Sequence, residues 1–523
     1  MMKKVQETNN LEKQPYALAL DVGTSSVRAA LYDAEGNEIE GTAARINRNL
    51  STTVEGGAEL DADKALAQVS QTIDDALKHS SQNISRIEIV ALSCFWHSLV
   101  GCDDAGHALT PVYTWADTRA ARAAEELKKL FNERETHNRT GCRFHPSYWP
   151  AKLLWLRQER KEVYRSVRRW MSFAEFLTLR LFGATAASVS MASGTGLFDV
   201  RRCAWDENLL DGLEISTRQL TKIAAPRESF TNLKDEYARR WPQLQNARWF
   251  PAIGDGAANN IGAGCTTLDR GALMIGTSGA MRVLWEGLPP ESLPCGLWCY
   301  RADERRIVLG GALSDGGGLY AWMKNALALN QHEERVEREL SELEPDAHGL
   351  TILPFWAGER STGWHADARG AILGLTQHTR PPDILRAAME AIAYRFALIA
   401  NELKELAPTI EIIASGGALV ASRVWTQIVA DVLGVPVKLS LVQEASSRGA
   451  VLLALEATGK IKRLQDAPTQ AMQTFEPDAA RHARYQTGIK RQQEIYERLI
   501  ADEEIARSLS DASTHSDKET KRA

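Results

Sequence analysis

The 523-residue chain lacks the marks of several common protein classes. Its seven cysteines stand at positions 94, 102, 142, 203, 265, 295 and 299, and no two of them form a CxxC pair. We therefore expect reduced thiols in a reducing compartment, without a disulfide framework or a zinc site. Residues 1–15 contain no apolar signal core, and no apolar run approaches the roughly 18 residues of a membrane span. These absences predict a cytoplasmic protein without a membrane partner.

Basic character and the commonest nucleotide-binding strings are missing as well. The formal net charge is -5, and no stripe of Lys and Arg stands out, so a nucleic-acid partner is not expected. No GxxxxGK[ST] string occurs, and no GxGxxG follows a predicted strand, which argues against a P-loop NTPase and a dinucleotide oxidoreductase. What remains is an ordinary composition, 44% hydrophobic and 25% charged, which is typical of a folded globular protein.

Strand-like and helix-like segments alternate along the chain. Apolar runs such as Tyr16–Leu20 and Glu411–Ala414 predict strands, whereas the longer patterns Ala62–Lys78 and Pro382–Leu406 predict helices. This alternation indicates an α/β protein, and the length favours two large domains over a single core. Residues 1–14 and 508–523 are polar and lack periodicity, so we expect both ends to be disordered.

The first motif with chemical content is the turn Gly23–Ser26, which lies between two predicted strands. Backbone N–H groups of a tight turn can point together at a phosphate, and hydroxyl groups and the cation of Arg28 add to this. Gly23 would let the backbone come close because it has no Cβ. Asp21 ends the first strand, where its carboxylate would hold magnesium through water. A plain β-hairpin with a polar turn explains the same string.

A similar pattern recurs in the second half of the chain. A predicted strand, Ala272–Ile275, runs into Gly276–Gly279, and Arg282 and a further apolar strand follow. A repeat at this distance predicts a duplicated domain, with the division near Pro251–Asp269. Two opposed phosphate loops would suit a triphosphate bound between the halves, although the second string also fits a simple turn.

Asp255 stands between two glycines, in the sequence Ile253-Gly254-Asp255-Gly256. Packing explains such a carboxylate poorly, and the glycines leave its approach open. Phosphoryl transfer to an alcohol needs a carboxylate that takes the hydroxyl proton. The alternative is an aspartate that caps the following helix.

Two further clusters suit a sugar and a nucleoside. Trp96 and His97, and later Asp117 and Arg119, combine aromatic faces with hydrogen-bonding groups, and Arg119 would suit the carboxylate of a sugar acid. A satisfied core histidine and an N-cap aspartate explain His97 and Asp117 equally well. The pair Gly416-Gly417 joins a strand to a helix and would leave bare backbone for adenosine, but this pattern is common.

In this order, the motifs resemble those of the FGGY family of carbohydrate kinases, in the actin-like ATPase superfamily, from about Tyr16 to Ile505. Residues 353–370 resemble a further hallmark of the family. The resemblance implies an α/β fold with two duplicated actin-like (ribonuclease H-like) domains and an interdomain cleft. Residues 15–255 would carry the sugar site and the first phosphate motif, and residues 256–507 the second phosphate motif and the adenosine motif.

The resemblance also implies ATP and Mg²⁺ as cofactors, and roles for individual residues. Asp255 would be the catalytic base, and Asp21 and Asp255 would hold the metal ion. The nucleotide would be bound by Gly23, Thr24, Ser25, Ser26, Arg28, Gly276, Thr277, Ser278, Gly317, Gly416, Gly417 and Ser422. The sugar would be bound by Trp96, His97, Asp117, Arg119 and Asp255.

The activity implied is transfer of a phosphoryl group from ATP to a terminal hydroxyl of a sugar or sugar acid. The His97-Ser98 pair, the WADTR string from Trp115 and the stretch Trp364–Gly370 resemble gluconokinases most, which makes conversion of gluconate to 6-phosphogluconate the first expectation. A xylulokinase, or another pentulose or polyol kinase, is the alternative enzyme, and a sugar-sensing pseudokinase is the alternative without activity. The expected partner is a small sugar or sugar acid, with a homodimer as an option.

Overall fold

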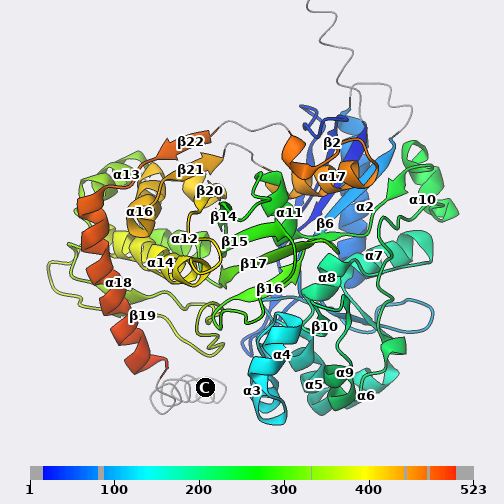
Figure 1. Ribbon diagram of the computed structural model, residues 1–523, viewed down its shortest axis with the longest axis horizontal. Coiled ribbons are helices and arrows are strands. Elements are labelled where there is room, and N and C mark those ends of the chain that lie inside the picture. Colours follow the sequence, from blue (N-terminus) through cyan, green and yellow to red (C-terminus); the bar gives the residue numbers. More distant parts are fainter. Residues whose placement is uncertain (1–15, 81–86, 331–332, 441–443, 468–471, 502–523) are drawn as a thin grey trace, which may run out of the picture.

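The computed structural model describes residues 16–80, 87–330, 333–440, 444–467 and 472–501. The ends for which disorder is predicted, 1–14 and 508–523, lie outside this range. The chain forms two halves, each built on its own sheet, and these lie side by side in Figure 1. We call them the first half, around the sheet of residues 17–254, and the second half, around the sheet of residues 270–475.

The first sheet is centred on a strand that is buried on both faces. That strand is β1, whose sequence ALALDV is nearly all apolar, as expected for a central strand covered on two sides. It pairs antiparallel with β2 and parallel with β6. The sheet comprises β3 (Ala44–Asn47), β2 (Ser26–Tyr32), β1 (Ala17–Val22), β6 (Ile89–Cys94), β12 (Arg248–Trp249) and β13 (Ile253–Gly254).

The second sheet repeats this arrangement. Its central strand β14 pairs antiparallel with β15 and parallel with β20, as β1 does with β2 and β6. The duplication predicted from the two glycine turns is therefore confirmed, and with it the two-domain α/β fold. The sheet comprises β16 (Trp298–Arg301), β17 (Arg306–Leu313), β15 (Gly279–Glu286), β14 (Arg270–Ile275), β20 (Glu411–Ser415), β21 (Val437–Ser440) and β22 (Met472–Phe475).

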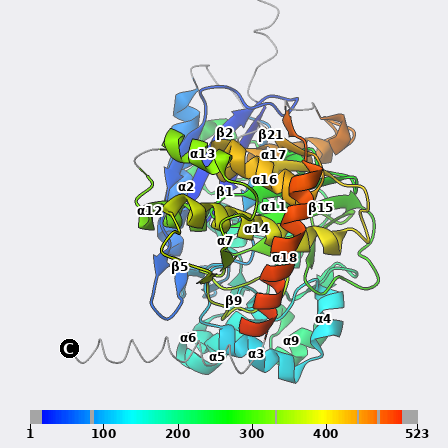
Figure 2. The same cartoon turned by 90° about the vertical axis from the view of Figure 1, so that its left-hand side faces the viewer.

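Helices cover the outer face of each sheet. The helix α2 (Ala62–His79) lies on the first sheet and begins where Asp61 accepts a hydrogen bond from the Lys64 N–H. Figure 2 shows α18 crossing the outer side of the second half, over α14 and α16. The helices of the second half are α12 (Gly317–Ala326), α13 (Glu333–Glu342), α14 (Pro381–Leu403), α15 (Gly417–Ala421), α16 (Arg423–Leu433) and α18 (Ala479–Leu499).

Two helices cross between the halves. The helix α11 (Asp255–Gly262) follows the first sheet but packs on β14 and β15 of the second, whereas α17 (Ala445–Ala457) follows the second sheet but packs on β1 and β6. The two helices also pack on each other. A Cβ on Gly262 would lie 1.8 Å from the Ala445 carbonyl oxygen, and one on Gly449 would lie 1.8 Å from that of Ala258. The glycines therefore allow the backbones to touch.

A helical extension of the first half lies at the lower right of Figure 1. Its elements are α3 (Ala121–Leu130), α4 (Glu133–Thr140), α5 (Trp149–Glu159), α6 (Lys161–Ser166), α7 (Phe173–Phe182), α8 (Val189–Ser193) and α9 (Glu207–Leu213). The helix α10 (Asp235–Arg240) lies apart from these, at the upper right of Figure 1, where Arg240 pairs with Asp74 of α2. Short strand pairs complete the fold: β4 (Ser51–Thr52), β5 (Ala58–Leu60), β8 (Val112–Tyr113), β7 (Val100–Cys102), β9 (Arg169–Met171), β10 (Phe198–Asp199), β11 (Ala204–Trp205), β18 (Thr351–Leu353) and β19 (Ala371–Leu373). Within the described ranges, no helix combines the length and apolar character needed to cross a membrane.

Candidate active site

The register of three parallel strands gathers two carboxylates at one edge of the first sheet. Asp21 of β1 lies beside Ser93 of β6, and Ile253 of β13 pairs with the same serine from the other side. Asp255 follows β13 directly, so Asp21 and Asp255 flank the end of β6. Burial raises the pKa of Asp21 to about 7, and the negative charge of Asp255 adds to this rise. A cation bound at this edge would therefore stabilise the two carboxylates in their ionised forms.

Asp255 is the first residue of α11 and half-buried. Its Oδ1 accepts the Gly256 N–H at 2.8 Å, and the Trp96 N–H is a second backbone donor. The N-cap of the helix is Gly254, so the alternative in which Asp255 caps the helix is wrong. Burial raises the pKa of Asp255, and the cations of Arg282 and Arg360 oppose this rise. A carboxylate in this state is suited to accept a proton.

Asp255 lines a cleft between the halves with about 620 Å³ of empty space. The predicted residues that share this cleft are Trp96, His97, Asp255 and Ser278. The structure therefore brings the candidate base, part of the sugar cluster and part of the second phosphate loop to one place. The other lining residues are Trp115, Ser147, Tyr148, Met274, Gly279, Ala280, Arg282, Trp298, Tyr300, Ala312, Arg360 and Trp364.

Two arginines of this cleft are absent from the predicted site. Arg282, on β15, is 4% exposed and donates to Asn259 Oδ1 at 3.2 Å. Arg360 donates to the Leu313 carbonyl at 2.8 Å and lies over the Trp115 ring. The Nε atoms of both arginines are buried without a hydrogen-bond partner, and burial lowers the pKa of Arg282 to about 10. The cleft therefore offers positive charge beside Asp255.

Aromatic rings from both halves meet around His97. The rings of Tyr148 and Tyr300 lie edge-on to it at 4.9 and 5.6 Å, and their hydroxyl groups are hydrogen-bonded to each other across the cleft. The His97 Nδ1–H donates to the Gly194 carbonyl, and burial lowers the pKa of His97 to about 3. The ring is thus neutral, and its Nε2 is left as an acceptor for a substrate hydroxyl. Trp96 donates its Nε1–H to Ser190 O at 2.9 Å.

Asp117 and Arg119 do not line the cleft in this structure. Asp117 is 2% exposed, accepts the Ala58 N–H at 3.2 Å and forms an ion pair with Arg119. Arg119 also pairs with Glu59 at 2.6 Å and lies over the Trp155 ring. The N-cap of α3 is Ala120, so Asp117 is not the cap of that helix. These two predicted sugar residues are bound to one another instead.

The first phosphate loop is held by arginines. Arg48, which follows β3, donates from its side chain to the Gly23 carbonyl and from its backbone N–H to Ser25 O. It is 6% exposed, and burial lowers its pKa to about 10. Arg28 forms ion pairs with Glu38 at 2.7 Å and with Glu444, next to α17. The charge of Arg28 is thus shared with two carboxylates. Arg48 was not predicted from the sequence as part of this loop.

The second phosphate loop is held by backbone contacts. The N–H groups of Gly317 and Gly318, at the start of α12, donate to the carbonyls of Gly276 at 2.7 Å and Thr277 at 2.9 Å. Gly416, with φ +102, lies against the end of β14, where a Cβ would come 2.4 Å from Ile275 O. The predicted nucleotide residues of the second half, Gly276, Thr277, Ser278, Gly317, Gly416 and Gly417, are therefore neighbours at the ends of β14 and β20.

Ser422, the remaining nucleotide residue of the second half, is the N-cap of α16. It is 2% exposed, accepts the Trp425 N–H at 3.1 Å and donates to the Glu337 carboxylate at 3.0 Å. Its hydroxyl is thus engaged within the protein in this structure.

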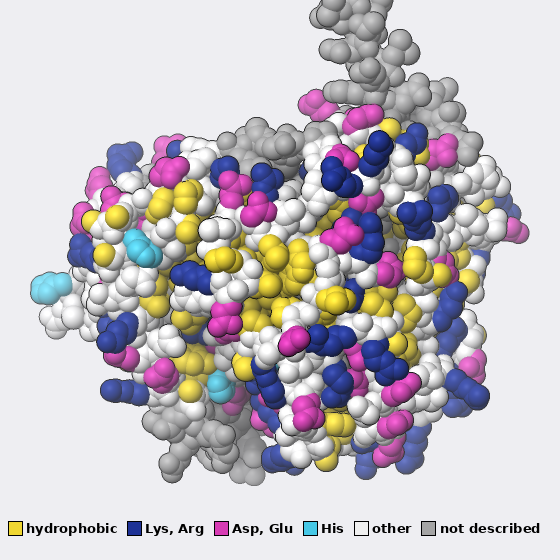
Figure 3. Space-filling view, in the orientation of Figure 1, with side chains coloured by type: hydrophobic (Ala, Val, Ile, Leu, Met, Phe, Trp, Pro, Cys, Tyr) yellow, Lys and Arg dark blue, Asp and Glu magenta, His cyan; other side chains and the backbone are white. Residues whose placement is uncertain are grey.

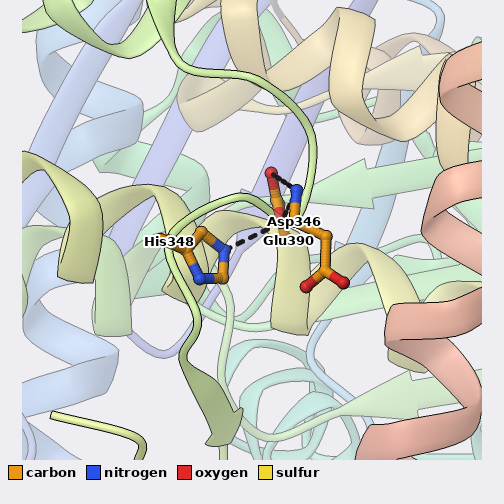
Figure 4. Close-up of side chains that lie close together, drawn as sticks. All are labelled: Asp346, His348 and Glu390. Atoms are coloured by element: carbon orange, nitrogen blue, oxygen red, sulfur yellow. Dashed lines mark hydrogen bonds and ion pairs between the residues drawn. The ribbon is translucent and has the colours of Figure 1, made fainter.

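Asp346, His348 and Glu390, away from the cleft, form a cluster of three metal-ligating residue types (Figure 4). Every ligand atom there already has a donor or acceptor. Glu390 accepts from His348 Nε2–H, Arg386, Tyr394 and Tyr485, and Asp346 pairs with Arg491. His348 Nδ1 accepts the Leu350 N–H. With two arginines against it, the cluster is a hydrogen-bonded network rather than a cation site.

Comparison with known proteins decides the family. The model of the FGGY family of carbohydrate kinases, N-terminal domain, matches residues 16–262, and the model of its C-terminal domain matches residues 271–458. The chain belongs to the FGGY family of carbohydrate kinases. Gluconokinase of Bacillus subtilis (strain 168) is 29% identical to this kinase, over 85% of this chain and 88% of the relative.

Solved structures of similar proteins agree with the family. Gluconate kinase from Lactobacillus acidophilus superposes with a TM-score of 0.84 and 29% identity, over 93% of this chain and 98% of that one. The ligand-bound xylulose kinase from the same species gives a TM-score of 0.85 and 28% identity, over 93% and 99%. This FGGY kinase is thus a phosphotransferase that uses ATP and a small carbohydrate substrate.

Proposed function

We propose that this kinase transfers a phosphoryl group from Mg·ATP to the terminal hydroxyl of gluconate, to give 6-phosphogluconate. The main support for this proposal is the cleft that Asp255, Ser278, Arg282 and Arg360 line together. It combines a carboxylate base, a phosphate loop and two cations that have no carboxylate partner of their own among the described residues. The gluconokinase and gluconate kinase relatives support the same substrate.

In the proposed reaction, Asp255 accepts the proton of the terminal hydroxyl as its oxygen attacks the γ-phosphorus. The raised pKa of Asp255 brings its basicity closer to that needed at neutral pH. The bond from the γ-phosphorus to the bridging oxygen of ADP breaks, and the proton stays on the carboxyl group until it exchanges with solvent. Backbone N–H groups of the loops around Gly23 and Gly276 would hold the phosphates.

The donor set at the end of β6 fits a divalent cation. Asp21, Asp255 and Glu444 lie close enough for the last two to raise the pKa of Asp21, which burial alone already raises. A cation would relieve this repulsion, and Asp21 and Asp255 are the residues that would hold Mg²⁺. When bound, the ion supplies positive charge to the phosphates of ATP.

The arginines favour an acidic sugar over a neutral one. Arg360 lies on the side of the cleft that carries Trp115 and His97, whereas Arg282 lies beside Gly256 at the start of α11. We assign the substrate carboxylate to Arg360 and the charge of the transferred phosphoryl group to Arg282. An arginine paired with a carboxylate in a buried cleft gives both charge and geometric selection.

The test is ADP release from Mg·ATP with gluconate, xylulose, ribulose and glycerol, for the wild type and Asp255→Asn. Gluconate should give the highest kcat/KM, and Asp255→Asn should lower kcat by about 10²- to 10⁴-fold because the base is lost. ATP binding, measured by calorimetry, should persist in the variant. ADP release that no sugar or aldonate stimulates would contradict the kinase assignment.

Xylulose is the second candidate, because xylulose kinases are among the similar proteins of known structure. Arg360→Met separates the two. Loss of a charge-assisted hydrogen bond worth about 1.5–3 kcal/mol should raise the KM for gluconate roughly ten- to a hundredfold. The kcat/KM for xylulose should change much less, since it has no carboxylate. A larger loss for xylulose than for gluconate would make the neutral sugar the substrate.

A further inference from the structure

A second cavity lies behind the catalytic carboxylate, on the other side of β13. It opens to solvent and is larger than the cleft that Asp255 lines. The two share no lining residue, but they share a wall. Ser190 lines the second cavity, and its carbonyl accepts Trp96 Nε1–H of the catalytic cleft. Ile253, two residues before Asp255, also lines it.

Both halves contribute to this cavity. The first half supplies β6, α8, β13 and the loop Ala224–Glu228, and the second supplies α17 and the turn Ala302–Arg305 between β16 and β17. In Figure 1, α8, α17 and β16 surround the region where the halves meet. A molecule in the cavity therefore touches both halves at once.

The body of the cavity is apolar and suits an apolar ligand. Leu92, Val189, Phe250, Ile253 and Leu453 line it, with several alanines between them. The polar side chains of its floor are already engaged, because Ser188 donates to Ala252 O and Ser190 Oγ accepts the Gly254 N–H. Apolar lining with few polar groups is typical of small-molecule sites.

The charges at the mouth favour an anion. Its carboxylates Glu228, Asp303 and Glu456 are all in ion pairs: Lys222 pairs with Glu228, Arg306 with both Asp303 and Glu456, and Arg305 with Glu456 and Glu286. Arg227 and Lys462 are exposed and have no ion pair among the described residues, whereas a single rim carboxylate there, Glu304, lacks one. Figure 3 shows Lys, Arg, Asp and Glu side chains around the hydrophobic middle of this face.

We propose that this cavity, which we call the rear cavity, is a regulatory site for a small amphipathic anion. The apolar body of the ligand packs on β6, α8 and α17, and its anionic group lies between Arg227 and Lys462. Since the ligand touches both halves, its occupancy is coupled to the closure of the catalytic cleft, and the coupling is reciprocal. The site is separate from those for ATP and sugar.

The probe is 8-anilinonaphthalene-1-sulfonate, which joins an aromatic body to a sulfonate and fluoresces in apolar surroundings. The neutral N-phenyl-1-naphthylamine is its matched control. We expect one sulfonate probe per chain, bound at least about tenfold more tightly than the neutral one because of the two cations. Equal affinity for the two probes would overturn the charge argument.

Charge reversal tests the location of the site. Arg227→Glu combined with Lys462→Glu should weaken the sulfonate probe about tenfold. Both side chains are exposed, so the fold should persist, as circular dichroism would verify. Arg165→Glu is the control, because it reverses an exposed charge on α6, away from the cavity. A double variant that binds the sulfonate probe as the wild type does would overturn the proposal.

Titration of Mg·ADP alone, which binds without turnover, distinguishes coupling from competition. Coupling should change the probe's dissociation constant at least about threefold and then reach a plateau. A shift that grows without limit would place the probe in the catalytic cleft, and an unchanged constant would refute the coupling; either result overturns the proposal. Binding is read by fluorescence and the titrant is a nucleotide without sugar, so the outcome does not depend on which sugar is phosphorylated.

Discussion

The two phosphate loops occupy equivalent places in the duplicated fold but are held by different means. In the first half, the Arg48 side chain bonds to the Gly23 carbonyl, and Arg28 is paired with Glu38 and Glu444. In the second half, the N–H groups of Gly317 and Gly318 bond to the loop carbonyls. The first loop is thus supported by the side chain and the backbone of Arg48, and the second by backbone alone among the contacts described.

This difference indicates which substitutions would displace each loop. The backbone segment that supports the second loop has no room for a Cβ at Gly317, whereas the first loop depends on the cation of Arg48. A Cβ on Gly317 would lie 2.6 Å from Gly276 O, but one on Gly23 would meet only Ser26 O at 3.3 Å. Substitutions in the loops and in the residues that support them can therefore break or sharpen the comparison.

The largest effect is expected for Gly317→Ala. The added methyl group would press on the Gly276 carbonyl and displace the loop or the start of α12. A displacement of about 1 Å at a reacting group costs roughly a hundredfold, so kcat/KM for ATP should fall by about that factor. Steady-state kinetics measures it, with the KM for sugar as the internal control. Kinetics within about twofold of the wild type would break the comparison.

Arg48→Met should have the next largest effect, in the first half. Loss of a charged hydrogen bond to the Gly23 carbonyl, worth about 1.5–3 kcal/mol, should lower kcat/KM for ATP about tenfold or more. Stability should change little, because a buried charge with unpartnered Nε and Nη1 atoms is removed as well. Urea melts alongside kinetics separate the two effects. A large loss of stability with normal kinetics would make Arg48 a folding residue only.

The contact between the halves should weaken in acid. His137 of the first half donates to Leu297 O of the second, and burial lowers its pKa to about 4. The folded state therefore binds fewer protons than the unfolded state between about pH 6.5 and 4, so stability present above pH 6.5 is lost as the pH falls. At pH 5 this histidine costs about 2 kcal/mol.

His137→Gln tests this dependence, because the amide can donate to the same carbonyl without titrating. Between pH 7.5 and 5.0 the variant should lose about 2 kcal/mol less stability than the wild type in urea melts. Parallel pH profiles of the two proteins would be incompatible with a neutral His137.

Gly23→Ala should have the smallest effect. The methyl group would meet only Ser26 O, at 3.3 Å, which a shift of a few tenths of an ångström relieves, so stability should stay within about 0.5 kcal/mol of the wild type. We expect kcat/KM for ATP to fall less than about fivefold. Thermal melts and kinetics measure the two quantities. A much larger kinetic loss with normal stability would mean that phosphate touches this Cα directly, and the two loops would then be equally intolerant.

Local patterns made the fold and the centre of the site predictable. The strand–turn–strand strings at Gly23 and Gly276 place each turn at the end of a buried strand, and the parallel register then brings Asp21 beside Asp255. Such signals lie within a few neighbouring residues. They were therefore readable without knowledge of the rest of the chain.

The remaining parts depend on contacts between distant residues. Tyr300 joins the cleft from the edge strand β16, which carries no local signature, and Arg360 joins it from the stretch 353–370, whose local pattern predicted only a loop. Asp117 and Arg119, predicted as sugar ligands, form an ion pair in this structure, and Glu59, far away in sequence, pairs with Arg119 as well. Arg48 is a single arginine after an exposed strand, and only folding puts its guanidinium beneath the first loop.

The exchange of α11 and α17 between the sheets has a consequence for synthesis of the chain. Although the first sheet ends at Gly254, the helix that covers β1 and β6 is not complete until Ala457. At about 5–20 residues per second, the nascent first half waits on the order of ten seconds or more with that face uncovered. The two halves are therefore not made one after the other as finished bodies. The fold of the first half can be completed only after most of the second half has been synthesised, because α17 is part of both.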